Sequence, residues 1–127
     1  MSVRISYGVI CDDVRREDNG KLILIGVYAR DMKLAGELPA QRRLSFLVAL
    51  EADSTCDVEF EASLLFNDEQ IFHADGEGHL DDKGLAFVRF PPAFARFKQE
   101  GELVFKARIK GGEWMQLWRG NVYSASS

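Results

Sequence analysis

Cysteine and proline are scarce in this chain of 127 residues, which contains two of the first and three of the second. Cys11 and Cys56 match no spacing known for zinc ligands. One disulfide at most could form between them, whereas small secreted domains that lack a sufficient core use several. We therefore expect two free thiols, a reducing compartment and a core made of apolar side chains.

Long hydrophobic runs are also missing. The longest, from Leu22 to Ala29, is far shorter than the roughly 20 residues that a membrane-spanning helix needs. The first residues, Met1 to Gly8, lack the apolar segment of a secretory signal peptide. These absences predict a cytoplasmic protein without a membrane partner.

An excess of positive charge is the third feature that the chain lacks. Lysine and arginine together number 16 against 20 aspartate and glutamate residues, so the formal net charge is −4. Proteins that bind nucleic acids usually present a basic field, so the balance predicts no nucleic-acid partner. Hydrophobic residues make up 46% and charged residues 28% of the chain, a composition typical of one globular domain covering residues 1–127.

Helical periodicity is absent over any long stretch, whereas alternation of apolar and polar residues recurs. Alternation with period two indicates strands that are buried on one face. It predicts a strand starting near Val3 and further strands over Lys21–Tyr28, Leu44–Leu50, Val58–Phe66, Leu85–Phe90 and Leu103–Ile109. About eight strands at this spacing favour an all-β fold, an antiparallel β-sandwich of immunoglobulin-like or jelly-roll-like type. A small β-barrel is the alternative.

Two connections receive specific predictions. The segment Asp75–Gly78 is rich in turn-forming residues, and we expect it to lie in a connection. Ala93–Lys98 is expected to form one helical turn, with Phe94 and Phe97 packing together against a sheet edge.

Asn19-Gly20 is the strongest hairpin signal in the chain. These residue types favour the positive φ angles of a two-residue type I′ turn, and such a turn would place Val14 opposite Ile25. The apolar face of the first strand would then have to change near Cys11–Asp13, so we expect a β-bulge or a local loop there.

A second hairpin is predicted around Gly111-Gly112. A two-residue turn there would place Phe105 opposite Trp118 and Ile109 opposite Trp114. Both tryptophans would then share a face with apolar residues, which favours core packing over a stacking platform for a sugar ring.

The opposite face of that hairpin is a candidate interface. In the predicted register Lys106 lies across from Leu117 and Arg108 across from Met115, so an apolar strip is framed by basic side chains. The candidate residues are Val104, Lys106, Arg108, Met115, Leu117 and Arg119. Methionine and arginine are enriched at interfaces, although long basic side chains also cover apolar surface without any partner.

Both histidines of the chain lie in one acidic segment. Imidazole and carboxylate groups bind zinc, and carboxylate oxygens bind calcium. The candidate metal ligands are His73, Asp75, Glu77, His79 and Asp81. Their spacing matches no established motif, and an acidic, glycine-rich connection with no ligand explains the same residues.

The pattern from Cys11 to Tyr28, Cys-Asp-Asp followed by Asn-Gly-Lys-Leu-x-Leu-Ile-Gly-Val-Tyr, resembles the opening of a family of small bacterial and phage proteins. That family is known only as a domain of unknown function. The similarity continues through Leu38-Pro39 and the strand from Leu44, mainly over residues 5–50. The resemblance implies a compact β-sandwich without an assigned activity, and it supplies no catalytic residues.

These observations favour a non-catalytic interaction module of a cytosolic bacterial or phage protein, without a cofactor. It would act by binding a protein partner or by self-association into a homo-oligomer. No nucleophile motif such as Gly-x-Ser-x-Gly occurs. Two alternatives remain: a metal-dependent enzyme or metal-binding module that uses the histidine cluster, and a small-ligand or carbohydrate-binding module.

Overall fold

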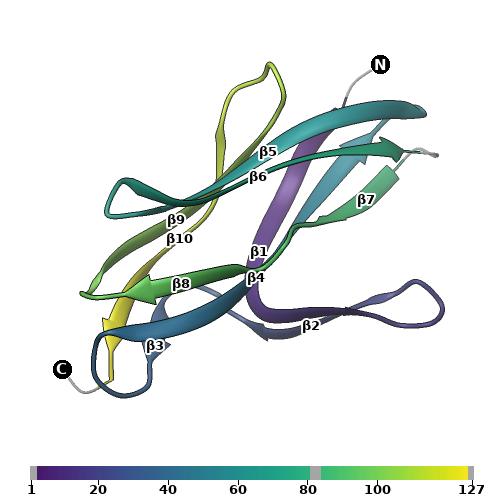
Figure 1. Ribbon diagram of the computed structural model, residues 1–127. Helices are drawn as coiled ribbons and strands as arrows, with labels where there is room; N and C mark the ends of the chain where they lie inside the picture. The colour runs from purple at the N-terminus through teal and green to yellow at the C-terminus, as the bar shows by residue number, and fades with distance from the viewer. Residues whose placement is uncertain (1–2, 81–83, 126–127) are drawn as a thin grey trace.

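The computed structural model describes residues 3–80 and 84–125, and within these it contains ten strands and no helix (Figure 1). The predicted all-β sandwich is confirmed, with more strands than the eight expected. The strands are β1 Val3–Arg16, β2 Leu22–Val27, β3 Met32–Leu34, β4 Ala40–Ala52, β5 Cys56–Phe66, β6 Glu69–Leu80, β7 Gly84–Arg89, β8 Ala93–Phe97, β9 Gly101–Ile109 and β10 Met115–Ser124. The described residues include no helix that could cross a membrane.

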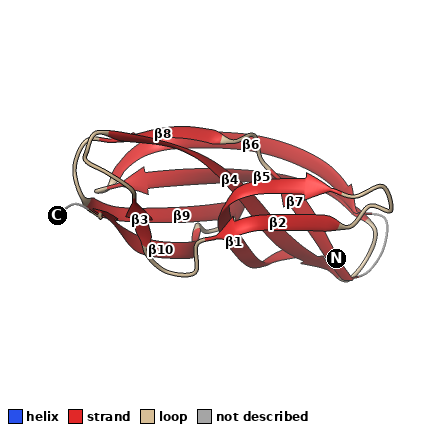
Figure 2. Cartoon of the chain, turned by 90° about the horizontal axis from the view of Figure 1, so that it is seen from below, coloured by secondary structure: helices blue, strands red, loops and turns tan. Residues whose placement is uncertain are grey.

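The strands form two sheets that pack together (Figure 2). The first sheet has the order β2-β1-β4-β7, and β8 pairs with the early part of β4. The second sheet has the order β3-β10-β9-β5-β6. The β3–β10 pair is parallel, and the other pairs recorded in the described residues are antiparallel.

The core lies between the sheets and is rich in phenylalanine. Phe46 of β4 stacks on Phe72 of β6 and on Phe105 of β9, with ring centroids 5.3 and 4.9 Å apart. Phe60 of β5 meets Phe90 edge-on at 5.5 Å. Aromatic pairs of this geometry add to the free energy gained by burial alone. The strand predicted at Leu44–Leu50 is indeed central and is buried on both faces.

The first hairpin differs from the prediction at its turn. Glu17 pairs with Lys21 through the backbone, so the loop consists of Asp18, Asn19 and Gly20. Among these only Gly20 has a positive φ, of 86°. This is the pattern of a type I turn followed by a glycine bulge. The type I′ assignment was therefore wrong, and Val14 lies opposite Leu24 instead of Ile25.

A type I′ turn does occur elsewhere. Phe66 pairs with Glu69, and the two residues between them, Asn67 and Asp68, have φ angles of 49° and 67°. Two central residues with positive φ define that turn. Asn67 also accepts a hydrogen bond from the Glu102 amide through its side chain at 2.9 Å. This contact helps to explain why a dipeptide without glycine adopts the turn.

The irregularity expected at Cys11–Asp13 takes another form. The register between β1 and β2 stays constant there, and the register shift of β1 lies between Ile5 and Tyr7, opposite β4. Cys11 and Val14 nevertheless belong to one apolar cluster, although residues three apart in a regular strand face opposite sides. Gly26 of β2, with a φ of 68°, lies beside Asp12 and marks the backbone distortion.

Two further predictions were wrong. Residues 75–78 do not form a turn but continue β6 as far as Leu80, because β5 pairs with this segment along its whole length. Residues 93–97 form strand β8 instead of a helical turn. Phe94 and Phe97 accordingly point to opposite sides: Phe97 is buried, whereas Phe94 is 79% exposed.

Candidate functional site

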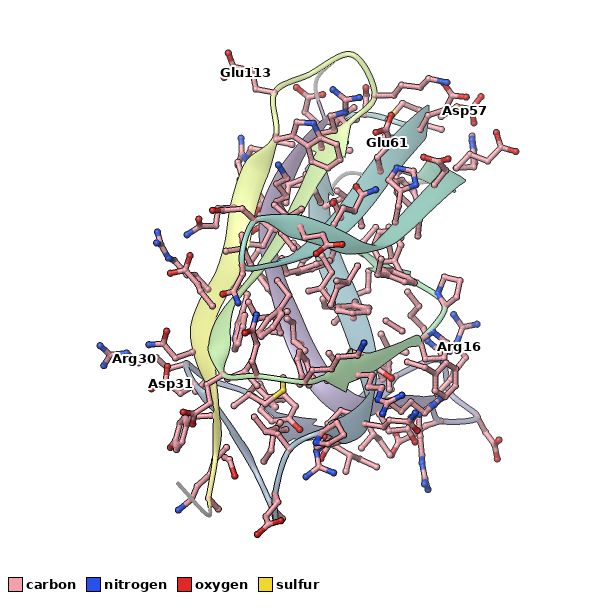
Figure 3. All side chains as sticks on the ribbon, turned by 60° about the vertical axis from the view of Figure 1, so that its left-hand side comes forward. Arg16, Arg30, Asp31, Asp57, Glu61 and Glu113 are labelled. Atoms are coloured by element: carbon pink, nitrogen blue, oxygen red, sulfur yellow. The ribbon has the colours of Figure 1, made fainter. Side chains whose placement is uncertain are left out.

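The predicted metal ligands lie on the outer, solvent-facing side of the second sheet. His73, Asp75, Glu77 and His79 alternate along β6, and side chains two apart in a strand share a face. Carboxylates of β5 join them on the same face, and Figure 3 shows Asp57 and Glu61 at this end of the sheet. Asp81, the fifth predicted ligand, lies outside the described residues.

The strand divides these side chains into separate groups. His73 Nε2 lies 3.8 Å from Glu61 Oε2 and 3.5 Å from Asp75 Oδ1. His79 Nδ1 instead lies 2.6 Å from Asp57 Oδ1. Six residues of strand separate the two histidines by roughly 20 Å. One ion therefore cannot bind both, and the five-residue site predicted from the sequence does not form as a unit.

The group around His73 gathers three ligand atoms. One atom each of Glu61, His73 and Asp75 lies within 4.8 Å of the others. The carboxylate of Glu61 is already paired, because the Arg108 guanidinium donates hydrogen bonds to both of its oxygens at 3.1–3.2 Å. This two-pronged pairing fits the planar arginine side chain. Glu61 was missed in the sequence because its partners come from β6 and β9.

The tryptophans differ in position. Trp118 is buried, and its Nε1 donates a hydrogen bond to the Tyr28 carbonyl oxygen, so the core placement predicted for it is confirmed. Trp114 is only partly buried and lies against two cations, with Lys106 Nζ 5.1 Å and Arg108 Cζ 4.6 Å from its ring centroid. The prediction of core packing for Trp114 was wrong.

The strip proposed along β9 and β10 is not assembled as predicted. The register shifts between Gln116 and Trp118, so Lys106 lies opposite Gln116 and Met115 lies opposite Ala107. Leu117 packs against the main core instead of the outer face. The remaining predicted residues, Val104, Arg108 and Arg119, stay on β9 and β10 without a continuous apolar strip between them.

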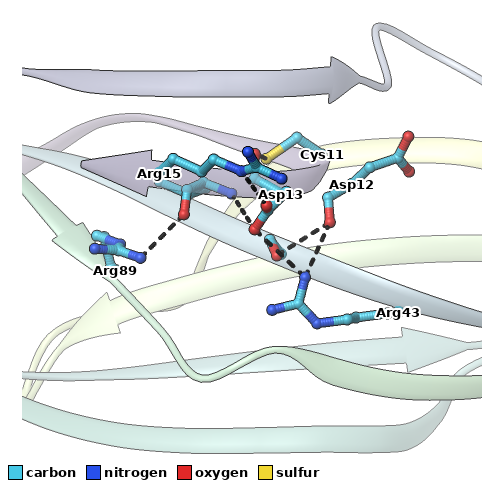
Figure 4. Close-up of polar contacts among 8 residues, drawn as sticks. Cys11, Asp12, Asp13, Arg15, Arg43 and Arg89 are labelled. Atoms are coloured by element: carbon cyan, nitrogen blue, oxygen red, sulfur yellow. Dashed lines mark hydrogen bonds and ion pairs between the residues drawn. The ribbon is translucent and has the colours of Figure 1, made fainter. Parts of the chain in front are cut away.

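A second charged cluster surrounds Asp13 at the start of the first hairpin (Figure 4). Asp13 accepts hydrogen bonds from Arg15 Nε and from the Val14 amide, both at 2.9 Å, and from Arg43 Nη1 at 3.4 Å. The bond from Arg15, followed by those from Arg43 and Val14, lowers the pKa of the Asp13 carboxyl. This carboxylate is held ionised and joins β1 to β4.

Both cysteines are buried free thiols, as the sequence predicts. Cys11 lies in the small cluster with Val14 and Leu47, whereas Cys56 lies in the main core. Burial raises the pKa of the Cys11 thiol, and the charges of Asp12 and Asp13 act in the same direction. A raised pKa leaves little thiolate near neutral pH, which disfavours a nucleophilic role.

The feature that the sequence did not reveal is the outer face of the first sheet. Tyr7, Ala49 and Phe87 lie side by side across β1, β4 and β7. Tyr7 is 43% and Phe87 48% exposed, yet Ala49 between them is fully buried. Side chains that alternate with the core-facing ones continue this face. We call Tyr7, Val9, Leu47, Ala49, Leu85 and Phe87 the outer apolar face.

The edge strand β2 carries further exposed apolar side chains. Ile23, Ile25 and Val27 are each 40–49% exposed. The sequence signal was available, because Leu22–Val27 and Leu44–Leu50 are apolar at consecutive positions. Continuous apolar runs indicate strands buried on both faces. On the second face of this sheet Cys11, Val14 and Leu47 form a small buried cluster under Val9, Leu22 and Leu24. Tyr7, Leu85 and Phe87 remain exposed.

A cleft of about 340 Å³ lies on one side of the sandwich, between β6 and β7. Its lining combines residues 75–80 of β6 with residues 86–91 at the end of β7 and beyond, and Phe60 lies at its base. The two strands belong to different sheets, so the cleft marks the place where the sandwich is open.

Comparisons with known proteins give little guidance. No protein-family model matches the chain, and no curated protein matches it. Among solved structures, the N-terminal domain of PorA is similar over 94% of this chain and 98% of that one, at 9% identity and a TM-score of 0.34. A likeness at this level carries no conclusion, and the resemblance to a family of unknown function stays a prediction.

Proposed function

We propose that this protein is a non-catalytic interaction module, which binds a protein partner or a second copy of itself through the outer apolar face. The observation that carries the proposal is the row Tyr7–Ala49–Phe87, in which two large exposed rings flank a buried alanine on the outside of the sheet. Contiguous exposed apolar surface on a soluble protein commonly marks a contact site.

The contrast between the two outer faces supports the same proposal. The outside of the second sheet carries ion pairs, among them Glu61 with Arg108 and Glu59 with Lys110. The outer apolar face has charges mainly at its border, where Arg4 pairs with Glu51 and Arg89 follows Phe87. An apolar centre with a charged rim is the usual arrangement of an interface.

The experiment compares two exposed apolar residues on opposite sides of the sandwich. Phe87→Lys places a charge on the outer apolar face, and Ile71→Lys places one on the second sheet at a similar exposure, 42% against 48%. Sedimentation at increasing concentration tests self-association, and quantitative capture from a bacterial extract tests partner binding. We expect Phe87→Lys to weaken association at least about tenfold, as for a residue central to an interface.

Ile71→Lys should leave the association unchanged. The proposal is wrong if the wild type neither self-associates nor captures a partner. It is also wrong if the two lysine variants behave alike.

Metal binding is a second candidate, favoured by the three ligand atoms of Glu61, His73 and Asp75. Arg108 competes for Glu61, so removing that arginine should strengthen binding. Calorimetric titration with zinc of Arg108→Gln and of Arg108→Gln/His73→Ala decides this. Heat that appears in the first variant and is lost in the second supports a site, and no heat in either excludes it.

A further inference from the structure

The open side of the sandwich presents two strand edges to one cleft. In the described residues β6 pairs with β5 and β7 pairs with β4, and each is the last strand of its sheet. Figure 1 shows both strands on the same side of the molecule. An edge strand has backbone N–H and C=O groups without ladder partners, and these can pair with an added extended chain.

Two glycines keep the floor of this cleft open. The positions of β6 that face the core include Gly76 and Gly78, between the buried Ala74 and Leu80. The Phe60 ring lies directly beneath Gly76. At Gly78 there is free space, since the nearest atom to an added Cβ would be Phe60 Cε1 at 4.0 Å. The cleft therefore has an apolar base with room above it.

The opposite wall of the cleft is mainly apolar. Arg89 also lines it, and its Nη2 donates a hydrogen bond to the Val14 carbonyl oxygen at 3.0 Å. Ala86 and Val88 of β7 are partly buried and pack against the core, and Phe90 follows them. An added strand that places every second side chain inward would bring those side chains onto Phe60, Val88 and Phe90. Small or branched apolar side chains suit such a space, because β-branched residues fit pleated surfaces.

The outward side chains next to the cleft are mainly acidic, with His79 beside them. Asp75 and Glu77 alternate with the two glycines along β6, and Glu59 lies opposite Glu77 on β5. Lys110 is 3.8 Å from Glu59, an exposed contact that leaves the region acidic. Cross-strand neighbours of opposite charge stabilise a sheet. An added strand would gain from lysine or arginine at the positions that face outward.

We propose that the cleft between β6 and β7 binds an extended segment of another protein as an added strand on β6, with apolar and basic residues alternating along it. The backbone of β6 supplies pairing, the glycine-lined floor takes the apolar side chains, and Asp75 and Glu77 select the basic ones. Addition of a strand to an exposed edge is an established way to bind peptides. This site differs from the outer apolar face, although Phe87 contributes to both, because Phe87 is also part of the cleft lining. A variant of Tyr7, which lies outside that lining, tests the two proposals separately.

The test uses a defined peptide of about eight residues, within the usual length of a strand, with valine and lysine alternating. One control peptide has glutamate in place of lysine, and a second has the same composition arranged as a valine block and a lysine block. Calorimetry or fluorescence anisotropy measures the affinity of each. We expect only the alternating valine–lysine peptide to bind, and its binding to slow amide hydrogen exchange in residues 75–80.

Gly78→Val is the most informative variant, because the valine side chain would fill space in the cleft. The backbone φ of Gly78 is not positive, so valine is not strained there. This variant should keep the fold and lose the peptide. Glu77→Lys leaves the cleft open and reverses one charge. It should weaken binding about two- to fivefold, as for exposed ion pairs. Glu113→Lys is the matched control, since Glu113 lies outside the cleft lining (Figure 3).

Binding of the block peptide or the glutamate peptide with equal affinity overturns the proposal. So does wild-type affinity in both Gly78→Val and Glu77→Lys, or protection of amides elsewhere but not in β6. If Gly78→Val does not fold, Glu77→Lys against Glu113→Lys still decides the outcome. Peptide binding that persists in Tyr7→Lys separates this site from the outer apolar face, because Tyr7 lies on that face and outside the cleft lining.

Discussion

Trp118 donates a hydrogen bond of 2.6 Å from its indole nitrogen to the carbonyl oxygen of Tyr28 and so links the two sheets. Tyr28 follows β2 of the first sheet, and Trp118 lies in β10 of the second. Trp118 is only 7% exposed. One side chain thus combines apolar packing with the pairing of a backbone acceptor, the usual arrangement for a buried tryptophan.

Replacing Trp118 tests this link. Trp118→Ala should reduce the free energy of unfolding by about 3–5 kcal/mol, the range for large aromatic truncations. Trp118→Phe keeps much of the packing but removes the donor, so it should cost about 1–2 kcal/mol. Trp114→Phe is the control, because that ring lies outside the core. Urea unfolding measures all three, and equal midpoints for Trp118→Phe and Trp114→Phe would contradict the assignment.

The positive φ of Gly20 leads us to predict that a β-branched residue at this position destabilises the protein. Nothing lies within 4 Å of an added Cβ at this position, so backbone strain alone should act. Gly20→Val should cost about 1–3 kcal/mol. Asp18→Ala, in the same loop but without a positive φ, should change stability by less than about 0.5 kcal/mol. Similar thermal midpoints for both variants would show that Gly20 is not strained.

The type I′ turn at Asn67-Asp68 predicts a gain in stability. Asp68 has a φ of 67°, which is unfavourable for a residue with a side chain. Asp68→Gly should stabilise the protein by about 0.5–1 kcal/mol, because glycine adopts a positive φ without steric cost. The same substitution one residue later, Glu69→Gly, falls in extended β6 and should destabilise it by about 0.5–1 kcal/mol. Thermal unfolding checks the opposite signs, and two changes of the same sign refute the turn assignment.

We predict that the protein loses stability at alkaline pH through the ionisation of Tyr28. Burial, with a hydrogen bond from its hydroxyl to Asp12 Oδ1 at 2.8 Å, raises the pKa of Tyr28 from 10.0 to about 12. The stability linked to this group is fully present below pH 10 and is lost as pH rises from about 10 to about 12, because only the unfolded chain ionises there. Tyrosine absorbance should show one phenol group that titrates near pH 12, and this step should be absent in Tyr28→Phe. A wild-type curve in which every tyrosine titrates near 10 would be inconsistent with this environment.

Local patterns predicted the strands well, because period-two alternation reflects burial of one face. The alternation over Val58–Phe66 corresponds closely to β5. Turn types and registers were predicted less reliably, since each depends on one or two residues. The loop at Asn19-Gly20 has one residue more than predicted. The register shift between Gln116 and Trp118 places Leu117, which was predicted on the surface, against the core.

The candidate sites depended on long-range pairing and could not be found from spacing. Glu61 joins His73 only because β5 lies beside β6, and Phe87 joins Tyr7 only because β4 lies between their strands. An exposed apolar residue in β7 has the same sequence pattern as a buried one. The consecutive apolar residues of Leu44–Leu50 indicated a strand that is apolar on both faces, but three-dimensional placement was needed to show which residues form the outer apolar face.

The most direct measurement of the central proposal is hydroxyl-radical footprinting of Tyr7 and Phe87, with Ile71 as an internal reference. Oxidation rates are compared between dilute protein and protein that is concentrated or bound to a captured partner. The proposed interface predicts that Tyr7 and Phe87 become protected at least about twofold, as expected for residues that lose most of their exposed surface in an interface, while Ile71 does not change. Association that leaves Tyr7 and Phe87 as reactive as in the dilute protein would contradict the account, as would a protein that remains monomeric and unprotected under both conditions.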